Sequence, residues 1–281
     1  MLFPRQINVC SNFTSPNPSA YNVIVNNLLL DVLVSGGRDG TLNLWDLRAT
    51  EGSAEQKPVS TVLGAHQSLK QNPRRRGSSS LPPSVTCAQF GADEFTLYTG
   101  GVDGYVQNSL ISCFVFANLR LTMCCAEHRC VKVWDTRAMS ASRRKAPAPV
   151  FTIECGSQNI SQSGVASLDI SKDGTRLLAS LTSSQLFVYN LQHPTCQETG
   201  SYYGHLNTHS FYVKSCFSPD DNMFLSGSSD GRLYIWEVDR PGAPVIQLSC
   251  HRGEVNNVDW CNADPLKLAS SSDDGYVRLW R

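Results

Sequence analysis

Short runs of alternating apolar and polar residues recur along the chain, and each run ends in an aromatic residue. The clearest are TLNLW (41–45), RLYIW (232–236) and YVRLW (276–280), and Asp-Gly directly precedes all three. Alternation with a period of two places successive side chains on opposite faces of a β-strand. Asp-Gly readily supplies the positive φ that a tight hairpin turn needs. The pattern therefore predicts β-hairpins that turn at Asp-Gly.

This hairpin is a repeated unit. The aligned stretches are SGGRDGTLNLWDLR (35–48), TGGVDG…CVKVWDTR (99–137), SGSSDGRLYIWEVD (226–239), SSSDDGYVRLW (270–280) and a degenerate ASLTSSQLFVYNLQ (179–192) with Tyr189 in place of Trp. Trp236 follows Tyr189 by 47 residues and precedes Trp280 by 44. This period, with Gly-His early and Trp-Asp late, is typical of WD40 propellers. We expect an all-β WD40 propeller of about five blade units, with the first and last incomplete.

The repeat also sets the expected domain organisation. Residues 1–30 show no repeat pattern and are predicted to precede the blades, which occupy residues 31–281. The segment KQNPRRRGSSSLPPS (70–84) reads as a basic, Ser-rich loop between blades. Its three arginines could form a nuclear-import or DNA-phosphate patch, but three charges are also typical of a solvated loop.

A polar line within each blade is the expected role of the recurrent His, Asp and Trp residues. In a typical WD40 blade a His, a strand hydroxyl, the turn Asp and the Trp hydrogen-bond in sequence, and Ser226 or Ser228 is the expected hydroxyl of the fourth blade. Because these sets recur with the repeat, we expect them to satisfy buried polar groups and not to be catalytic. The predicted structural residues are His66, His205, His251, Asp39, Asp103, Asp230, Asp274, Trp236 and Trp280.

One repeat is interrupted. Four residues separate the turn Gly from the Trp in three repeats, but 29 separate Gly104 from Trp134, an excess of 29 − 4 = 25. Removing residues 105–129 restores the four-residue spacing, as GGVDG-CVKVWDTR. Gly104 to Val106 can be encoded with a splice-donor sequence, and His128-Arg129 with an acceptor. We therefore interpret 105–129 as a translated, unspliced intron or an error in the gene model.

A genuine insert is the competing interpretation of residues 105–129. It could be a long functional loop, although blade hairpins usually have short turns. It could also bind zinc, with candidate ligands Cys113, Cys124, Cys125, His128 and Cys130, but the clear paired C-x2-C set of a zinc site is missing. We expect neither a metal nor a cofactor.

Composition narrows the function further. The 24 basic and 24 acidic residues balance, so charge gives no sign of a general attraction to nucleic acid or membranes. The 11 cysteines are odd in number and several lie in apolar runs, which is typical of reduced intracellular thiols. No secretory signal or membrane-spanning run is recognisable. Phosphate-binding Gly loops, a nucleophile elbow and HExxH are also missing, so we do not expect an enzyme.

The two W-D-x-R sequences, WDLR (45–48) and WDTR (134–137), together with GHLNTHSFYVKSCFSPDDNMFLSGSSDGRLYIW and EVNNVDWC…SSSDDGYVRLW, give the chain a specific resemblance. It resembles the denticleless family, the WD40 substrate receptors of cullin-4 RING ubiquitin ligases. The resemblance covers roughly residues 31–281 apart from 105–129. Compared with the family, upstream blades and the long C-terminal tail with its clamp-binding element are missing, so direct binding of the sliding clamp PCNA is not expected.

The resemblance implies a function and a site. Such a receptor binds the adaptor damaged-DNA-binding protein 1, recruits PCNA-associated substrates during replication, the cell cycle or DNA damage repair, and acts in the nucleus. It needs no membrane and no specific nucleic-acid contact. The implied adaptor-binding residues are Arg48, Arg137, Asp46, Asp135, Trp45 and Trp134. A guanidinium at a strand end suits a carboxylate or carbonyl partner, although each arginine could instead merely cap its own blade.

Two alternatives to the receptor stay open. The chain could be a generic WD40 interaction scaffold in another nuclear complex, and adaptor binding that depends on the two arginines would discriminate the two functions. It could also be a non-functional product that carries an intron.

Overall fold

The structure is a computed structural model of the whole chain. It describes residues 23–27, 32–37, 39–46, 58–65, 84–91, 96–101, 130–137, 149–155, 164–193, 196–208, 210–249 and 251–281. The predicted insert 105–129, the basic loop up to residue 83, Arg48, His66 and Asp103 lie outside these ranges. Among the described residues, no helix has the length and apolar character needed to cross a membrane.

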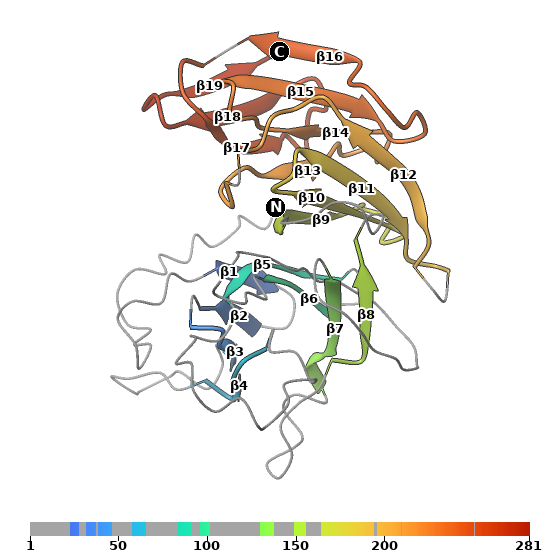
Figure 1. Cartoon of the computed structure of the whole chain (residues 1–281), viewed down its shortest axis with the longest axis vertical. Coiled ribbons are helices and arrows are strands. Elements are labelled where there is room, and N and C mark those ends of the chain that lie inside the picture. The colour runs from blue at the N-terminus through green and yellow to red at the C-terminus, as the bar shows by residue number, and fades with distance from the viewer. Residues whose placement is uncertain are drawn as a thin grey trace.

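Five antiparallel sheets follow one another along the chain (Figure 1), and each is one blade. Blades one and two consist of β1 (Val23–Asn27), β2 (Val32–Gly36), β3 (Leu42–Asp46) and β4 (Ser60–Val62), then β5 (Val85–Phe90), β6 (Thr96–Gly101), β7 (Cys130–Asp135) and β8 (Phe151–Glu154). Blade three consists of β9 (Val165–Ile170), β10 (Arg176–Leu181), β11 (Gln185–Asn190) and β12 (Glu198–Tyr203).

Blade four consists of β13 (Ser215–Phe217), β14 (Met223–Ser226), β15 (Arg232–Glu237) and β16 (Ile246–Ser249). Blade five has the three strands β17 (Val255–Trp260), β18 (Leu268–Ser272) and β19 (Val277–Trp280). The all-β WD40 architecture is thus confirmed as an incomplete propeller.

The register confirms the repeat alignment. In every blade the aromatic residue of the third strand lies opposite an apolar residue of the second strand: Leu33↔Trp45, Leu97↔Trp134, Leu177↔Tyr189, Phe224↔Trp236 and Leu268↔Trp280. Three of the Asp-Gly turns have the expected positive φ, with 75° at Gly40, 80° at Gly231 and 81° at Gly275. The Leu97↔Trp134 pair also confirms that residues 105–129 enter between the second and third strands of blade two.

The expected start of the propeller at residue 31 is wrong. β1 lies inside the segment assigned as non-repeat, and it pairs along its whole length with β2, so the first blade has four strands. The physical reason is that the recognisable repeat signals sit in the second and third strands. A first strand such as VIVNN carries only a β-prone composition, which does not distinguish it from other segments. Only the last blade is incomplete among the described residues.

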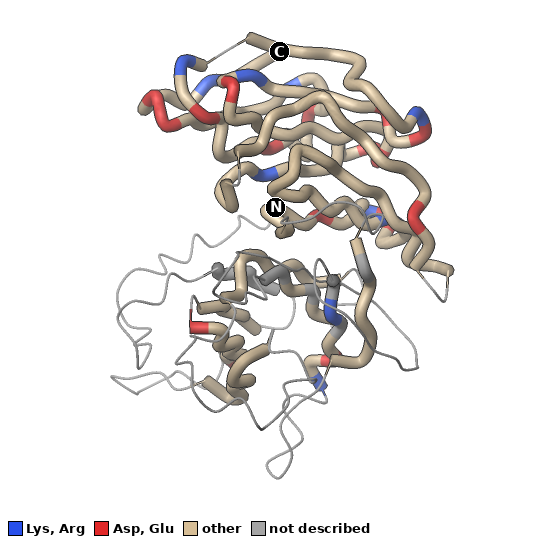
Figure 2. The backbone as a smooth tube through the Cα atoms, in the orientation of Figure 1, with Lys and Arg blue, Asp and Glu red and all other residues tan. Residues whose placement is uncertain are grey.

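The core lies between the blades. Each of the four buried clusters joins two consecutive blades, as where Leu225, Leu233 and Ile235 of blade four pack with Val255 and Trp260 of blade five. Charged residues of the β9–β19 part gather mainly at the turns on either side of the sheets, with both signs mixed (Figure 2). The faces between blades therefore form the apolar core, and the charged side chains of this part lie mainly at the turns.

Candidate functional site

The W-D-x-R sequence of blade two forms a compact polar fork at the end of β7. The backbone N–H and Nε–H of Arg137 both donate to Oδ1 of Asp135 at 2.9 Å, and Nη2 donates to Oδ2 at 2.9 Å. The Arg137 side chain is 61% exposed and that of Asp135 is 32% exposed. A two-point contact of this kind fixes the plane of a guanidinium. Asp135 therefore holds Arg137 in one orientation at the surface.

The two tryptophans of the W-D-x-R sequences lie in the core. Trp134 is 2% exposed and donates its indole N–H to Thr99 Oγ1 at 3.2 Å, whereas Trp45 is 5% exposed and donates to Ser35 Oγ at 2.9 Å. A side chain buried this deeply cannot contact an adaptor. The assignment of Trp45 and Trp134 as adaptor-binding residues is thus corrected: they hold the blades that carry the polar residues.

Asp46 and Asp135 occupy equivalent positions at the ends of β3 and β7. Asp46 lies opposite Val32 and Asp135 lies opposite Thr96, one residue beyond the buried tryptophan pair. Blades one and two are consecutive, so these carboxylates belong to the same edge of neighbouring sheets. We name this the W-D-x-R edge, where the third strands end.

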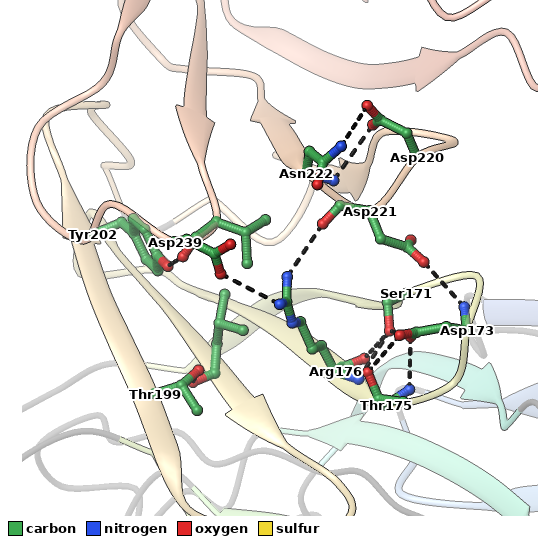
Figure 3. Close-up of polar contacts among 12 residues, drawn as sticks. Ser171, Asp173, Thr175, Arg176, Thr199, Tyr202, Asp220, Asp221, Asn222 and Asp239 are labelled. Carbon is green, nitrogen blue, oxygen red and sulfur yellow. Dashed lines mark hydrogen bonds and ion pairs between the residues drawn. The ribbon is translucent and has the colours of Figure 1, made fainter.

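Blades three and four use the fourth position of W-D-x-R differently. Gln192 and Asp239 stand where blades one and two have arginine. Asp239 forms an ion pair of 3.3 Å with Nη2 of Arg176, at the start of β10 in blade three (Figure 3). Nη1 of Arg176 also donates to the backbone oxygen of Asp221 at 3.3 Å. In this part of the edge the charged groups join two blades.

The turns of blades three and four are joined next to this ion pair. The Asp221 carboxylate accepts the backbone N–H groups of Lys172 and Asp173, at 2.7 and 3.0 Å (Figure 3). Although partial burial opposes it, hydrogen bonds from Ser171 and Thr175 hold the pKa of Asp173 below its usual value. Sequence reasoning missed this network, because its partners lie 45–49 residues apart and follow no repeated motif.

The predicted polar line is complete in blade five. His251 Nδ1 lies 3.0 Å from Asp274 Oδ2, His251 Nε2 lies 2.9 Å from Ser270 Oγ, and Trp280 Nε1 donates to Ser270 Oγ at 3.1 Å. Burial would raise the pKa of Asp274, but N–H donors of Arg252, Tyr276 and His251 hold it at about 2. These contacts form the hydrogen-bonded line that the sequence predicted for His251, Asp274 and Trp280. In blade one, Asp39 accepts the backbone N–H of Thr41 at 3.1 Å and stabilises the turn.

The same line does not form in blade four, contrary to our expectation for His205, Asp230 and Trp236. Asp230 Oδ2 accepts the Tyr234 hydroxyl at 2.7 Å, and Trp236 donates to the backbone oxygen of Tyr203 at 3.2 Å. Ser226 donates to the Gly227 oxygen and Ser228 to the Leu206 oxygen. The Asp230 carboxylate thus accepts from Tyr234 and from the backbone N–H of Arg232.

His205 is left buried in blade four. It is 3% exposed, neither ring nitrogen has a hydrogen-bond partner among the described residues, and its ring meets that of Trp236 edge-on with centroids 5.8 Å apart. Burial lowers its pKa to about 4, with the Asp230 charge opposing this shift. Aromatic packing replaces the polar line here, since Phe224 stacks on Trp236 with ring centroids 5.2 Å apart.

The inner strands provide further contacts that the sequence did not reveal. Asp169 Oδ2 accepts the Phe217 N–H at 2.7 Å, and Ser167 Oγ accepts the Ser215 N–H at 3.1 Å. Burial raises the pKa of Asp169 to about 7 despite the Phe217 hydrogen bond. In the described part of the chain, no three His, Cys, Asp or Glu side chains gather in a way that could hold a metal ion. The proposed zinc ligands of the insert, Cys113 to His128, lie outside that part.

Comparison with known proteins agrees with this architecture. The WD40 family, described as "WD domain, G-beta repeat", matches residues 21–46, 196–237 and 242–281. The first match begins before β1, in agreement with the four-stranded first blade. The chain is 33% identical over 262 residues to Denticleless protein homolog A of Xenopus laevis, and the alignment covers 89% of this chain and 33% of that protein. The chain belongs to the denticleless family of WD40 proteins.

Other denticleless proteins match to a similar extent. The Denticleless protein homolog of Homo sapiens is 32% identical over 261 residues, covering 89% of this chain and 32% of that protein. Protein lethal(2)denticleless of Drosophila melanogaster is 29% identical over 250 residues, covering 89% of this chain and 30% of that protein. This denticleless-family chain therefore spans about a third of the length of the curated relatives that it matches.

Proposed function

We propose that this chain is a non-catalytic substrate receptor of a cullin-4 RING ubiquitin ligase, and that it binds the adaptor damaged-DNA-binding protein 1 through the W-D-x-R edge of blades one and two. One observation carries the proposal: the exposed Arg137 guanidinium, oriented by Asp135 at the end of β7. A held guanidinium loses less side-chain entropy on binding than a mobile one. Arg48, at the same position of WDLR, would provide the second contact.

The restriction to blades one and two has a reason in the fold. Asp239 replaces the arginine in blade four and forms an ion pair with Arg176, so this stretch of the edge joins blades. The competing role for Arg137, capping of its own blade, uses the same Asp135 contact. The Arg137 side chain is 61% exposed and that of Asp135 is 32% exposed, and surface ion pairs of this type contribute only about 0–1 kcal/mol to stability. A contribution to the stability of blade two is thus a weak explanation for the contact between Arg137 and Asp135.

The remaining parts of the proposal rest on the family resemblance. The substrates would be PCNA-associated proteins of replication and the cell cycle, ubiquitinated in trans by the ligase. The location would be the nucleus. Neither a membrane nor a specific nucleic-acid sequence is a proposed partner, in keeping with the balanced charge of the chain.

The decisive experiment is a pull-down with purified adaptor. It compares the chain as given, the chain without residues 105–129, and that shortened chain with Arg137→Ala or Arg137→Lys. We expect the shortened chain to bind and both Arg137 variants to lose most of the binding, because lysine cannot form the two-point contact with Asp135. Arg176→Ala is the matched control, since it removes an arginine of the same edge from blade three.

Two results would overturn the proposal. If the Arg137 variants bind the adaptor as well as the shortened chain does, Arg137 is not part of the adaptor-binding site. If every version stays soluble and none binds, the generic scaffold becomes the better function.

A further inference from the structure

The segment between β15 and β16 of blade four crosses onto the fourth strand of blade three. It comprises residues 238–245, VDRPGAPV. Within this crossing segment Gly242 forms a parallel bridge with Tyr202 of β12. The Gly242 N–H donates to the Ser201 oxygen at 3.0 Å, and the Gly242 oxygen accepts the Tyr203 N–H at 3.1 Å. Blade four thus adds main-chain hydrogen bonds to the outer edge of blade three.

Two side-chain contacts with blade three fix the beginning of the crossing segment. The buried Tyr202 hydroxyl donates to the Val238 oxygen, and Asp239 forms the ion pair of 3.3 Å with Arg176 (Figure 3). The Tyr202 ring packs edge-on against Phe224 of β14, with ring centroids 4.8 Å apart. The backbone of Tyr202 therefore belongs to blade three, and its side chain contacts blade four.

Two glycines next to or within β12 make this close approach possible. A Cβ added at Gly200 would lie 2.9 Å from Cγ of Pro241, and one added at Gly204 would lie 2.7 Å from Cδ of Pro244. Real Cβ atoms do not come this close to their neighbours, so any larger residue would push the prolines away. Gly242 has a φ of 119°, which residues with side chains rarely adopt. The crossing therefore depends on glycine on both sides.

The far end of β12 is also bound by blade four. The main-chain N–H of Tyr203 donates to Gly242, and its oxygen accepts the Trp236 indole N–H at 3.2 Å. Directly after the crossing, the Val245 N–H donates to the Ile235 oxygen at 2.8 Å and returns the chain to its own blade. The last residue of β12 thus lies between β11 and two separate contacts with blade four.

We propose that residues 238–245 are a clasp that couples the local opening of β12 in blade three to the opening of the blade-four connection. The outer strand of a sheet has one neighbouring strand, and such poorly supported elements open first in native proteins. The clasp gives β12 a second neighbour, so β12 opens only when the clasp is released. None of these contacts involves Arg137, so the clasp stands or fails separately from the adaptor site.

Hydrogen exchange of the full chain, measured at single amides by mass spectrometry with fragmentation, tests this coupling. Gly242→Pro removes the N–H that donates to Ser201, and proline cannot adopt a φ of 119°. The informative amides are those of Gly200 and Tyr202, because by strand alternation they face β11 and not the clasp. We expect both amides to exchange at least about tenfold faster in the variant, since β12 loses its second neighbour.

A milder variant and a control complete the test. Pro241→Ala combined with Pro244→Ala removes the ring contacts with Gly200 and Gly204 but keeps every main-chain acceptor, and it should change the same amides less. This variant also decides the question if Gly242→Pro does not fold. Arg176→Ala is the control. It removes only an exposed ion pair with the same segment, and it should leave the exchange of β12 within about twofold of wild type.

Two outcomes would overturn the clasp. In the first, only the Tyr203 amide exchanges faster in the clasp variants, which would make residues 238–245 a loop that merely covers that amide. In the second, the amides of all blades exchange faster by the same factor, which would mean that the variants lower the global stability of the chain and do not act on β12.

Discussion

Trp280 donates its indole N–H to the Ser270 hydroxyl at 3.1 Å, and the same hydroxyl lies 2.9 Å from His251 Nε2. The single Ser270 hydroxyl thus forms hydrogen bonds with both the Trp280 indole and the His251 ring. At the equivalent place in blade four, Ser226 has the same register but donates to the neighbouring Gly227 oxygen at 3.0 Å. Identical residues at identical positions therefore have different energetic roles.

The first prediction compares these two serines. Ser270→Ala leaves His251 Nε2 and the Trp280 indole without their partner, and we expect the free energy of unfolding to fall by about 2–3 kcal/mol. Ser226→Ala removes a single local hydrogen bond and should cost about 1 kcal/mol or less. Urea unfolding of both variants measures the difference. Equal losses would show that the polar line of blade five contributes nothing beyond an ordinary buried serine.

The second prediction concerns pH and His205. Its pKa in the folded chain is about 4 and its usual value is 6.5, so the unfolded chain binds a proton first as the pH falls. Titration of this ring therefore does not lower the free energy of unfolding above pH 6.5. As the pH falls from 6.5 to about 4, the free energy of unfolding decreases. The loss should be about 3 kcal/mol, and His205→Phe should abolish it.

Urea unfolding at pH 7.5 and pH 4.5 measures this difference for the wild-type chain and the variant. His193→Gln is the control, since His193 is exposed, and it should keep the wild-type pH dependence. A His205→Phe chain that loses as much stability as the wild type on acidification contradicts the assignment.

The third prediction concerns the ion pair between blades three and four. Asp239 is 82% exposed and its Nη2–Oδ1 distance to Arg176 is 3.3 Å, so solvent screens the attraction. A double-mutant cycle with Arg176→Ala and Asp239→Ala should give a coupling energy below about 1 kcal/mol. Asp173→Ala is a useful comparison, because the Asp173 carboxylate also attracts Arg176 by its charge but is not the partner in the ion pair. A coupling energy above about 2 kcal/mol would mean that the pair holds the two blades together.

The fourth prediction concerns residues 105–129. β6 and β7 pair in the regular blade register although 29 residues separate Gly104 from Trp134. Deleting residues 105–129 shortens the connection between Gly101 of β6 and Cys130 of β7 from 28 residues to three. The loop-closure entropy cost is then smaller, so the deletion should stabilise the chain by about 1–2 kcal/mol. Thermal and urea unfolding of the full and shortened chains provide the measurement. A less stable shortened chain would show that the insert makes native contacts and is a genuine part of the fold.

Much of the fold followed from local sequence signals. The turns at Gly40, Gly231 and Gly275 and the third strands, which carry Trp or Tyr189 at or next to their ends, could be predicted, because alternation and Asp-Gly act over a few residues. β1 could not, because its strand signal is as weak as that of many loops. At the candidate site the position of Arg137 was predictable, but its fork with Asp135 and the burial of Trp134 required the structure.

The sequence by itself determined the repeat, and with it the identity of the hairpins, since each hairpin is specified within about fifteen residues. Only the tertiary structure decided how equivalent residues are used. His251 completes a polar line with Asp274 and Ser270, whereas both ring nitrogens of His205 lack a partner among the described residues and Asp230 accepts from Tyr234. Leu233 is buried and Val277 is exposed, because blade five covers the first and no described strand covers the second. These differences arise from contacts between blades, which a repeated sequence pattern does not encode.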